Sequence, residues 1–114
     1  MKNFKILNKS EFTDLIYYEK ERSERTNNHF SLIHVDFKKY NGHTNAQTFK
    51  EFVKLMESTF RTLDRAGLTK NNTICILLPE TKADGAKYAA VKFKNKLKEL
   101  LGEKSSLLDF AIST

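Results

Sequence analysis

The spacing of apolar residues changes from segment to segment along this chain, and that alternation restricts the folds it can adopt. Residues Phe30 to Phe37 and Thr73 to Leu78 form short apolar runs rich in β-branched side chains, which predicts two buried strands. Residues Ala46 to Leu63 instead repeat their apolar side chains with a period near ~3.6, which predicts an amphipathic helix. That stripe consists of Phe49, Phe52, Val53, Met56, Phe60 and Leu63. Strands that alternate with helices indicate an α/β sandwich around one sheet.

Two further helices and one strand complete the predicted order. The first helix runs from Ser10, a plausible N-cap, to Thr26. The third runs from Lys82 to Leu101, with Thr81 as its cap, Gly102 as its end signal and a buried face of Ala86, Ala89, Ala90, Phe93, Leu97, Leu100 and Leu101. The last strand spans Leu107 to Ser113, turn signals occur at Asn41-Gly42, Ala66-Gly67 and Lys70-Asn71-Asn72, and one more strand fits before Thr73.

Length and composition place the chain among ordinary globular domains. Its 114 residues suffice for one domain with a real core, and no apolar run approaches the ~20 residues of a membrane span. The chain starts no signal peptide, because no apolar stretch follows Met1 to Phe4. The natural-looking Met1 favours a whole chain or an N-terminal piece. A single cysteine, Cys75, fits a reducing cytoplasm and reads as a small buried hydrophobe between two isoleucines.

The basic charge has two interpretations. A net charge of +6 can indicate partners that carry phosphate groups. It can also reflect a solvated face, because five lysines interleave with the apolar stripe of the third helix: Lys87, Lys92, Lys94, Lys96 and Lys98. No compact basic block with interleaved aromatic residues stands out, so we expect no nucleic-acid partner.

Four stretches of the chain resemble GGDEF domains, the diguanylate cyclase family. They are Leu7-Asn8-Lys9-Ser10-Glu11-Phe12, Glu21 to Arg25 followed by Phe30 to Asp36, Arg61-Thr62-Leu63-Asp64, and Leu77-Leu78-Pro79-Glu80-Thr81 with Gly85-Ala86. The resemblance implies an α/β (α+β) sandwich of nucleotide-cyclase-like or ferredoxin-like type, with a mostly antiparallel central sheet and flanking helices. It covers residues 1–114 as a single domain that is short at its C-terminus relative to the family.

The catalytic signature of the family is missing. Alignment on Leu77-Leu78-Pro79 puts the Gly-Gly-Asp-Glu-Phe position on Lys70-Asn71-Asn72-Thr73-Ile74. The family's glycines let the backbone approach substrate phosphates, and its acids support Mg²⁺. Asn72 and Thr73 cannot replace carboxylates on that hard cation. We therefore expect no diguanylate cyclase activity and no Mg²⁺ cofactor.

A second acidic site of the family is half kept. Asp36 matches the first acid of the family's Asp-x-Asp, whereas the second position holds Lys38. The positions that read guanine in the family fall on Thr44 and Val53. Asp36 is thus a vestigial metal ligand at most. His34 shares its strand face, and His43 lies in a turn of unknown position, so no third ligand is evident.

The motif that remains is the family's inhibitory site, an Arg-x-x-Asp that binds cyclic di-GMP five residues before the signature. Arg61 and Asp64 have this spacing, since five residues separate Asp64 from Lys70. An arginine fork suits a phosphate or a guanine edge, and a carboxylate accepts from guanine N–H groups. The family often adds a cation from the next helix, for which Lys92 is the candidate and Lys87 or Lys96 are substitutes. Arg61 and Asp64 could instead simply pair with each other on a helix surface.

Three functions remain open from the sequence. The first is a non-catalytic GGDEF-like regulatory domain of bacterial type, for which the resemblance implies a cyclic di-GMP receptor that signals to a partner protein. The second is a protein-interaction or dimerisation module without a ligand. The third, a basic ferredoxin-like RNA-binding domain, lacks the aromatic residues that such domains carry on central strands. Residual enzyme activity would need acids from another chain or a different substrate.

Overall fold

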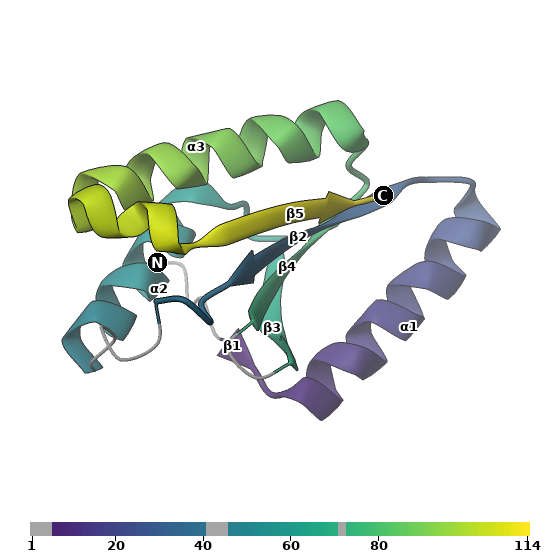
Figure 1. Ribbon diagram of the computed structural model, residues 1–114. Coiled ribbons are helices and arrows are strands. Elements are labelled where there is room, and N and C mark those ends of the chain that lie inside the picture. Colours follow the sequence, from purple (N-terminus) through teal and green to yellow (C-terminus); the bar gives the residue numbers. More distant parts are fainter. Residues whose placement is uncertain (1–5, 41–45, 71–72) are drawn as a thin grey trace.

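The computed structural model describes residues 6–40, 46–70 and 73–114, which form one α/β unit (Figure 1). Its elements are β1 (Ile6–Leu7), α1 (Lys9–Thr26), β2 (Phe30–Asp36), α2 (Ala46–Thr59), β3 (Arg65–Lys70), β4 (Thr73–Pro79), α3 (Ala83–Leu101), the 3-10 helix η1 (Gly102–Leu107) and β5 (Asp109–Ser113). The expected sandwich around one sheet is confirmed. No helix within the described ranges is both long and apolar enough to cross a membrane.

The five strands form one mixed sheet in the order β1-β3-β4-β2-β5. All neighbours are antiparallel except β1 and β3, which are parallel. The central ladder pairs Phe30 with Pro79 at one end and Asp36 with Thr73 at the other. The end of β4 therefore lies beside the start of β2, and the chain leaves the sheet there to enter α3.

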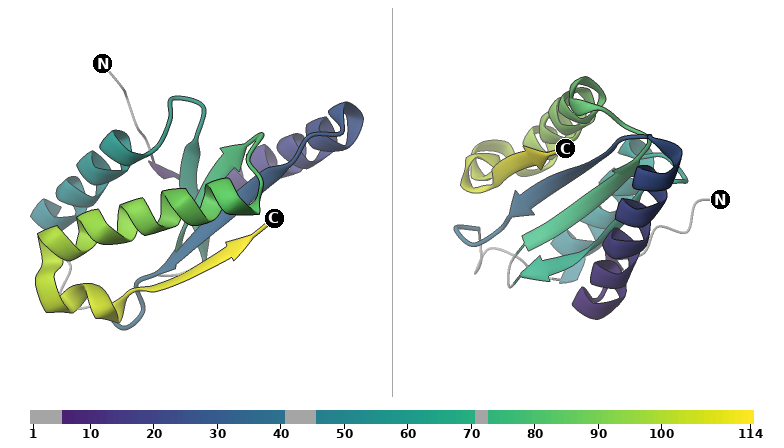
Figure 2. Two further views of the ribbon diagram at one scale, coloured as in Figure 1. Left: turned by 90° about the horizontal axis from the view of Figure 1, so that it is seen from above. Right: turned by 90° about the vertical axis from the view of Figure 1, so that its right-hand side faces the viewer.

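Helices cover both faces of the sheet, as the two views of Figure 2 show. Burial alternates along β2, so that Ser31, Ile33 and Val35 are fully buried while their neighbours are only half-buried. Ile33 and Val35 belong to the larger core, to which α2 contributes Phe52 and Met56, α3 contributes Ala86, Ala90, Phe93 and Leu97, and the residue just after α2 contributes the ring of Phe60. The opposite face carries a smaller core of Phe12, Cys75 and Leu77 beneath α1.

A close approach between helix and strand fixes the start of α1. Phe12 is fully buried, and a Cβ atom placed on Gly67 would lie 2.3 Å from its ring atom Cγ. Only glycine leaves that space for the ring. The prediction of a turn at Ala66-Gly67 is therefore wrong, because both residues lie inside β3 and the glycine accommodates a packed side chain.

The ends of the helices differ from the predicted ones. Asn8, not Ser10, caps α1, and it forms a capping box in which its side chain accepts from the backbone N–H of Glu11 at 2.8 Å. The N-cap of α3 is Lys82 without a side-chain hydrogen bond, so the predicted Thr81 cap is wrong. Gly102 ends α3 as predicted, with a φ of 62°.

The second helix ends at Thr59, four residues before the predicted end. Leu63 consequently lies in the turn that follows and is 59% exposed, while Phe49 near the helix start is 41% exposed. The rest of the predicted stripes of α2 and α3 packs in or against the core. η1 occupies the start of the predicted last strand, so β5 begins at Asp109. The predicted turns at Asn41-Gly42 and Asn71-Asn72 lie outside the described residues.

Candidate functional site

The Arg-x-x-Asp motif forms a closed turn between α2 and β3. The backbone N–H of Arg61 donates to Asp64 Oδ2 at 2.7 Å, and the Asp64 N–H donates to the Arg61 carbonyl at 3.0 Å. The carboxylate thus captures the N–H that would otherwise continue the helical ladder, which ends with the bond from Phe60 to Met56. This explains why the motif lies after α2 and not on it, contrary to the expectation.

The two side chains of the motif are also paired with each other. Arg61 Nη2 donates to Asp64 Oδ1 at 2.9 Å, and Nε lies within 3.4 Å of Oδ2. The Asp64 side chain is only 2% exposed, while that of Arg61 is 52% exposed. The alternative that Arg61 and Asp64 pair with each other is thus confirmed. The carboxylate is buried, however, and does not lie on a helix surface. The buried Asp64 carboxylate thus fixes the orientation of the half-exposed Arg61 guanidinium, which differs from an ion pair between two exposed side chains.

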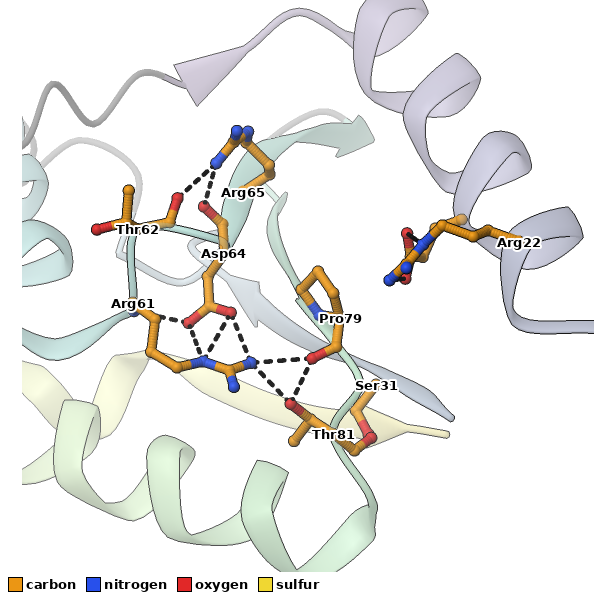
Figure 3. Close-up of polar contacts among 9 residues, drawn as sticks. Arg22, Ser31, Arg61, Thr62, Asp64, Arg65, Pro79 and Thr81 are labelled. Atoms are coloured by element: carbon orange, nitrogen blue, oxygen red, sulfur yellow. Dashed lines mark hydrogen bonds and ion pairs between the residues drawn. The ribbon is translucent and has the colours of Figure 1, made fainter. Parts of the chain in front are cut away.

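The strand end beside the turn gives the guanidinium a second anchor. Arg61 Nη2 also donates to the Pro79 carbonyl at 3.0 Å and to Thr81 Oγ1 at 2.8 Å (Figure 3). The Thr81 hydroxyl in turn donates to the Pro79 carbonyl at 2.9 Å. Thr81 therefore holds the arginine instead of capping α3. Nη1 makes no hydrogen bond to any described residue, and Figure 3 shows it pointing away from Asp64.

These groups form one wall of a pocket of about 270 Å³. Its other walls come from the end of α2, from Leu78 and from the first turns of α3; the lining residues are Thr59, Phe60, Arg61, Asp64, Leu78, Thr81, Gly85, Tyr88, Ala89 and Lys92. The structure thus brings together the three predicted site residues Arg61, Asp64 and Lys92. The volume lies just below the usual range for small-molecule sites, about 300–1,000 Å³, and suits one base or one phosphate of a larger ligand.

The two substitutes for Lys92 lie elsewhere. Lys96 donates to the Ser58 carbonyl at 3.1 Å and to its hydroxyl at 3.2 Å, which ties α3 to the end of α2. Lys87 lines a different groove beside β5. The pocket also includes Tyr88, which is 73% exposed and was not among the predicted site residues. Its spacing from Gly85 and Lys92 on one helix face is the signal that identifies it.

The predicted metal ligand does not gather further ligands around it. Asp36 ends β2, and its Oδ1 accepts from the Lys38 backbone N–H at 2.8 Å. Among the described residues, no group of three or more histidine, cysteine, aspartate or glutamate side chains is close enough to hold a metal ion. On β5 the cross-strand partner of Asp36 is Asp109, which pairs with Lys39 at 3.7 Å. His34 contacts Ser113 Oγ at 3.1 Å.

The remaining predicted positions have plain structural roles or lie outside the described residues. Val53 packs against the larger core. Thr44, His43 and residues Asn71-Asn72 of the signature position are not described. Cys75 is fully buried, and burial raises the pKa of its thiol to about 12, so the interpretation as a buried hydrophobe is confirmed.

Known proteins match this chain by structure and not by sequence. No family model and no curated protein matches the chain. Solved structures do match, among them the active GGEEF domain of a diguanylate cyclase from Vibrio cholerae, with a TM-score of 0.72, 18% identity, and coverage of 95% of this chain and 74% of that one. A DGC protein from Thermotoga maritima matches with a TM-score of 0.70, 15% identity, and coverage of 96% and 79%.

A third match comes from a structure with a bound nucleotide. The GGDEF domain of DgcB from Caulobacter crescentus, in complex with c-di-GMP, has a TM-score of 0.70, 12% identity, and coverage of 96% of this chain and 71% of that one. Identities this low establish a shared fold and nothing finer. The chain therefore has the fold of GGDEF diguanylate cyclase domains.

Proposed function

We propose that this chain is a non-catalytic regulatory domain that binds cyclic di-GMP in the pocket between the Arg61–Asp64 turn and α3. The observation that carries the proposal is the convergence of Arg61, Lys92 and Tyr88 on one pocket, with Arg61 held in place by a buried carboxylate. Two cations supply donors for a phosphate or a guanine edge. An exposed aromatic ring supplies a face for a base to stack on.

Asp64 serves in this proposal as a positioning residue. Its carboxylate already accepts from the Arg61 backbone N–H and from the guanidinium. The groups left for a ligand are Arg61 Nη1 and the Lys92 ammonium. The ligand thus meets a guanidinium whose orientation is fixed before binding, which lowers the entropic cost of association. In this respect the site differs from the sequence expectation, in which the carboxylate itself accepts from guanine N–H groups.

Loss of catalysis is the second part of the proposal. The signature position reads Lys70-Asn71-Asn72-Thr73-Ile74, and Lys38 replaces the second acid after Asp36. Phosphoryl transfer depends on metal ions that neutralise developing charge, and these positions supply a single carboxylate. We expect no cyclic di-GMP from GTP in the presence of Mg²⁺ or Mn²⁺, as measured by chromatography of the reaction mixture. Formation of cyclic di-GMP at a rate proportional to the protein concentration would refute the loss of catalysis.

The RNA-binding alternative has less support. Domains of that kind stack bases on aromatic side chains of an open sheet face. Here the corresponding face of β4 presents Cys75 and Leu77, which are buried beneath α1 with Phe12.

Calorimetric titration with cyclic di-GMP tests the proposal. We expect saturable binding that weakens about 10- to 100-fold in Arg61→Ala, since a hydrogen bond to a charged group contributes about 1.5–3 kcal/mol. Lys92→Ala should weaken it as well. Lys98→Ala is the matched control, because it removes an exposed lysine from the same helix outside the pocket.

The titrations distinguish a cyclic di-GMP receptor from a protein that binds another nucleotide, binds elsewhere or does not bind. GMP and GTP, titrated in parallel, show whether the cyclic dinucleotide is preferred. Binding that survives in both Arg61→Ala and Lys92→Ala would place the ligand elsewhere. An absence of heat at high ligand concentration, with a cooperative unfolding transition showing that the protein is folded, would refute the receptor function.

A further inference from the structure

One edge of the sheet has no strand beside it in the described part of the chain. β5 is the last strand in the order β1-β3-β4-β2-β5, and it pairs only with β2. Figure 2 shows it running along the border of the molecule next to α3. An edge strand exposes a row of backbone N–H and C=O groups that can pair with another strand.

A groove of about 300 Å³ follows this edge between α3 and β5. The helix contributes Lys87, Val91 and Lys94 to its lining, and the strand contributes Phe110, Ala111 and Ile112. Val91 is 56% exposed and adds an apolar side chain to the rim of the groove. The groove thus combines an apolar strip with the open hydrogen-bonding edge.

The charge of the groove is positive. Lys87 and Lys94 lie on one face of α3 with Val91 between them, at positions i, i+7 and i+4. Neither lysine forms an ion pair with a described residue, although Lys94 Nζ lies 5.3 Å from the centre of the Phe110 ring. The acid of β5, Asp109, is engaged by Lys39 at 3.7 Å.

We propose that this groove binds an extended acidic segment of another protein, which adds to the sheet as a strand beside β5. Backbone pairing supplies affinity in this mode of recognition, and alternate side chains supply specificity. The segment would carry an acid opposite each of the two lysines, Lys87 and Lys94, and an apolar residue opposite Val91. These three residues would occupy alternate positions of the segment. The two lysines lie about 10 Å apart along the helix axis, and two acids four residues apart in a strand span about 13 Å. The flexible lysine stems cover this difference.

Charge disfavours a second copy of this chain as the occupant. Two-fold pairing of β5 with itself would place both α3 helices on the same side of a continuous sheet. Lys87 and Lys94 of each copy would then face the same lysines of the other, and like charges placed opposite each other are destabilising.

The test uses the peptide acetyl-Thr-Glu-Thr-Val-Thr-Glu-Thr-amide and the ¹⁵N-labelled 114-residue protein in NMR titrations. We expect saturable shifts at β5 and at the outer face of α3. The double variant Lys87→Glu/Lys94→Glu should lose them and should instead bind the same peptide with lysine in place of glutamate. Lys9→Glu/Lys20→Glu is the control, since both of these lysines are exposed on α1.

Three results would overturn the proposal. The first is an absence of shifts at millimolar peptide. The second is equal shifts with the glutamate and lysine peptides, which would show that charge does not select the segment. The third is self-association of the protein alone through β5, seen as concentration-dependent shifts there and a dimer in sedimentation, which would make a second copy the occupant. Cyclic di-GMP takes no part in this test, so its outcome is independent of the proposed function.

Discussion

The contact between Gly67 and Phe12 allows a quantitative test of how α1 is attached to the sheet. In Gly67→Ala the new methyl group would lie 2.3 to 2.5 Å from three atoms of Phe12. Carbon atoms prefer separations of about 3.5–4.0 Å, so the ring must move by more than 1 Å, roughly, or leave its site. Overpacking of this kind costs about 1–3 kcal/mol, and three simultaneous overlaps place the variant at the upper end, about 3 kcal/mol.

A double-mutant cycle separates this overlap from other effects. Phe12→Ala alone should cost about 3–5 kcal/mol, because the side chain is fully buried. In that background Gly67→Ala has no ring to meet, and it should be neutral or stabilise by up to about 1 kcal/mol through the unfolded chain. The two single effects should therefore fail to add by about 3 kcal/mol.

Urea unfolding followed by circular dichroism measures all four corners of the cycle. A total stability near the middle of the range expected for a domain of this size, about 10 kcal/mol, leaves each variant folded at 25 °C. Unchanged slopes with shifted midpoints would show that only stability changed. Additive costs within about 0.5 kcal/mol would refute the steric argument, since they would mean that Phe12 and Gly67 do not compete for the same space.

Two further predictions follow from single residues. Burial raises the pKa of Cys75 to about 12 from its usual 9.0, so its contribution to stability is complete below pH 9.0 and is lost as the pH rises toward 12. Cys75→Ala should flatten this alkaline loss between pH 8 and 10.5, roughly, and equal losses in both proteins would contradict the assignment. Glu80 has a φ of 52°, a conformation that costs most residues about 1–2 kcal/mol, while its ion pair with Arg22 at 3.9 Å is long, half exposed and therefore weak. Glu80→Gly should therefore raise the free energy of unfolding by up to about 1 kcal/mol, and a clear loss in thermal unfolding would show that the ion pair dominates.

Sequence periodicity predicted the elements that bury large apolar stripes. The stripe of α3 follows directly from local spacing, because the helix has one face on the core. For β2 the sequence predicted only a buried strand, and the alternating burial, which includes the polar Ser31, is a finding of the structure. Gly67 was misread because a glycine in a strand and a glycine in a turn look alike in sequence. The residue that decides between them, Phe12, lies on another element.

The conformation of the site depended on contacts between distant segments. The Thr81 hydroxyl is held by Arg61, twenty residues earlier in the chain, so a local capping pattern could not reveal its role. The choice of Lys92 over Lys87 and Lys96 depends in the same way on the placement of α3. Lys96 reaches Ser58 and Lys87 lies beside β5, and neither neighbour can be read from the helix alone.

The two ends of α1 are attached by different physical forces. Phe12 holds one end through apolar packing, while at the later turns Arg22, oriented by Glu19 of the same helix at 3.0 Å, reaches Glu80 at 3.9 Å. Salt screens charge pairs and leaves apolar contacts intact or strengthens them, so added salt should free the far end of the helix first. Amide hydrogen exchange along α1 would then follow a gradient that steepens with ionic strength, with the amides near Arg22 exchanging faster and those near Phe12 remaining protected.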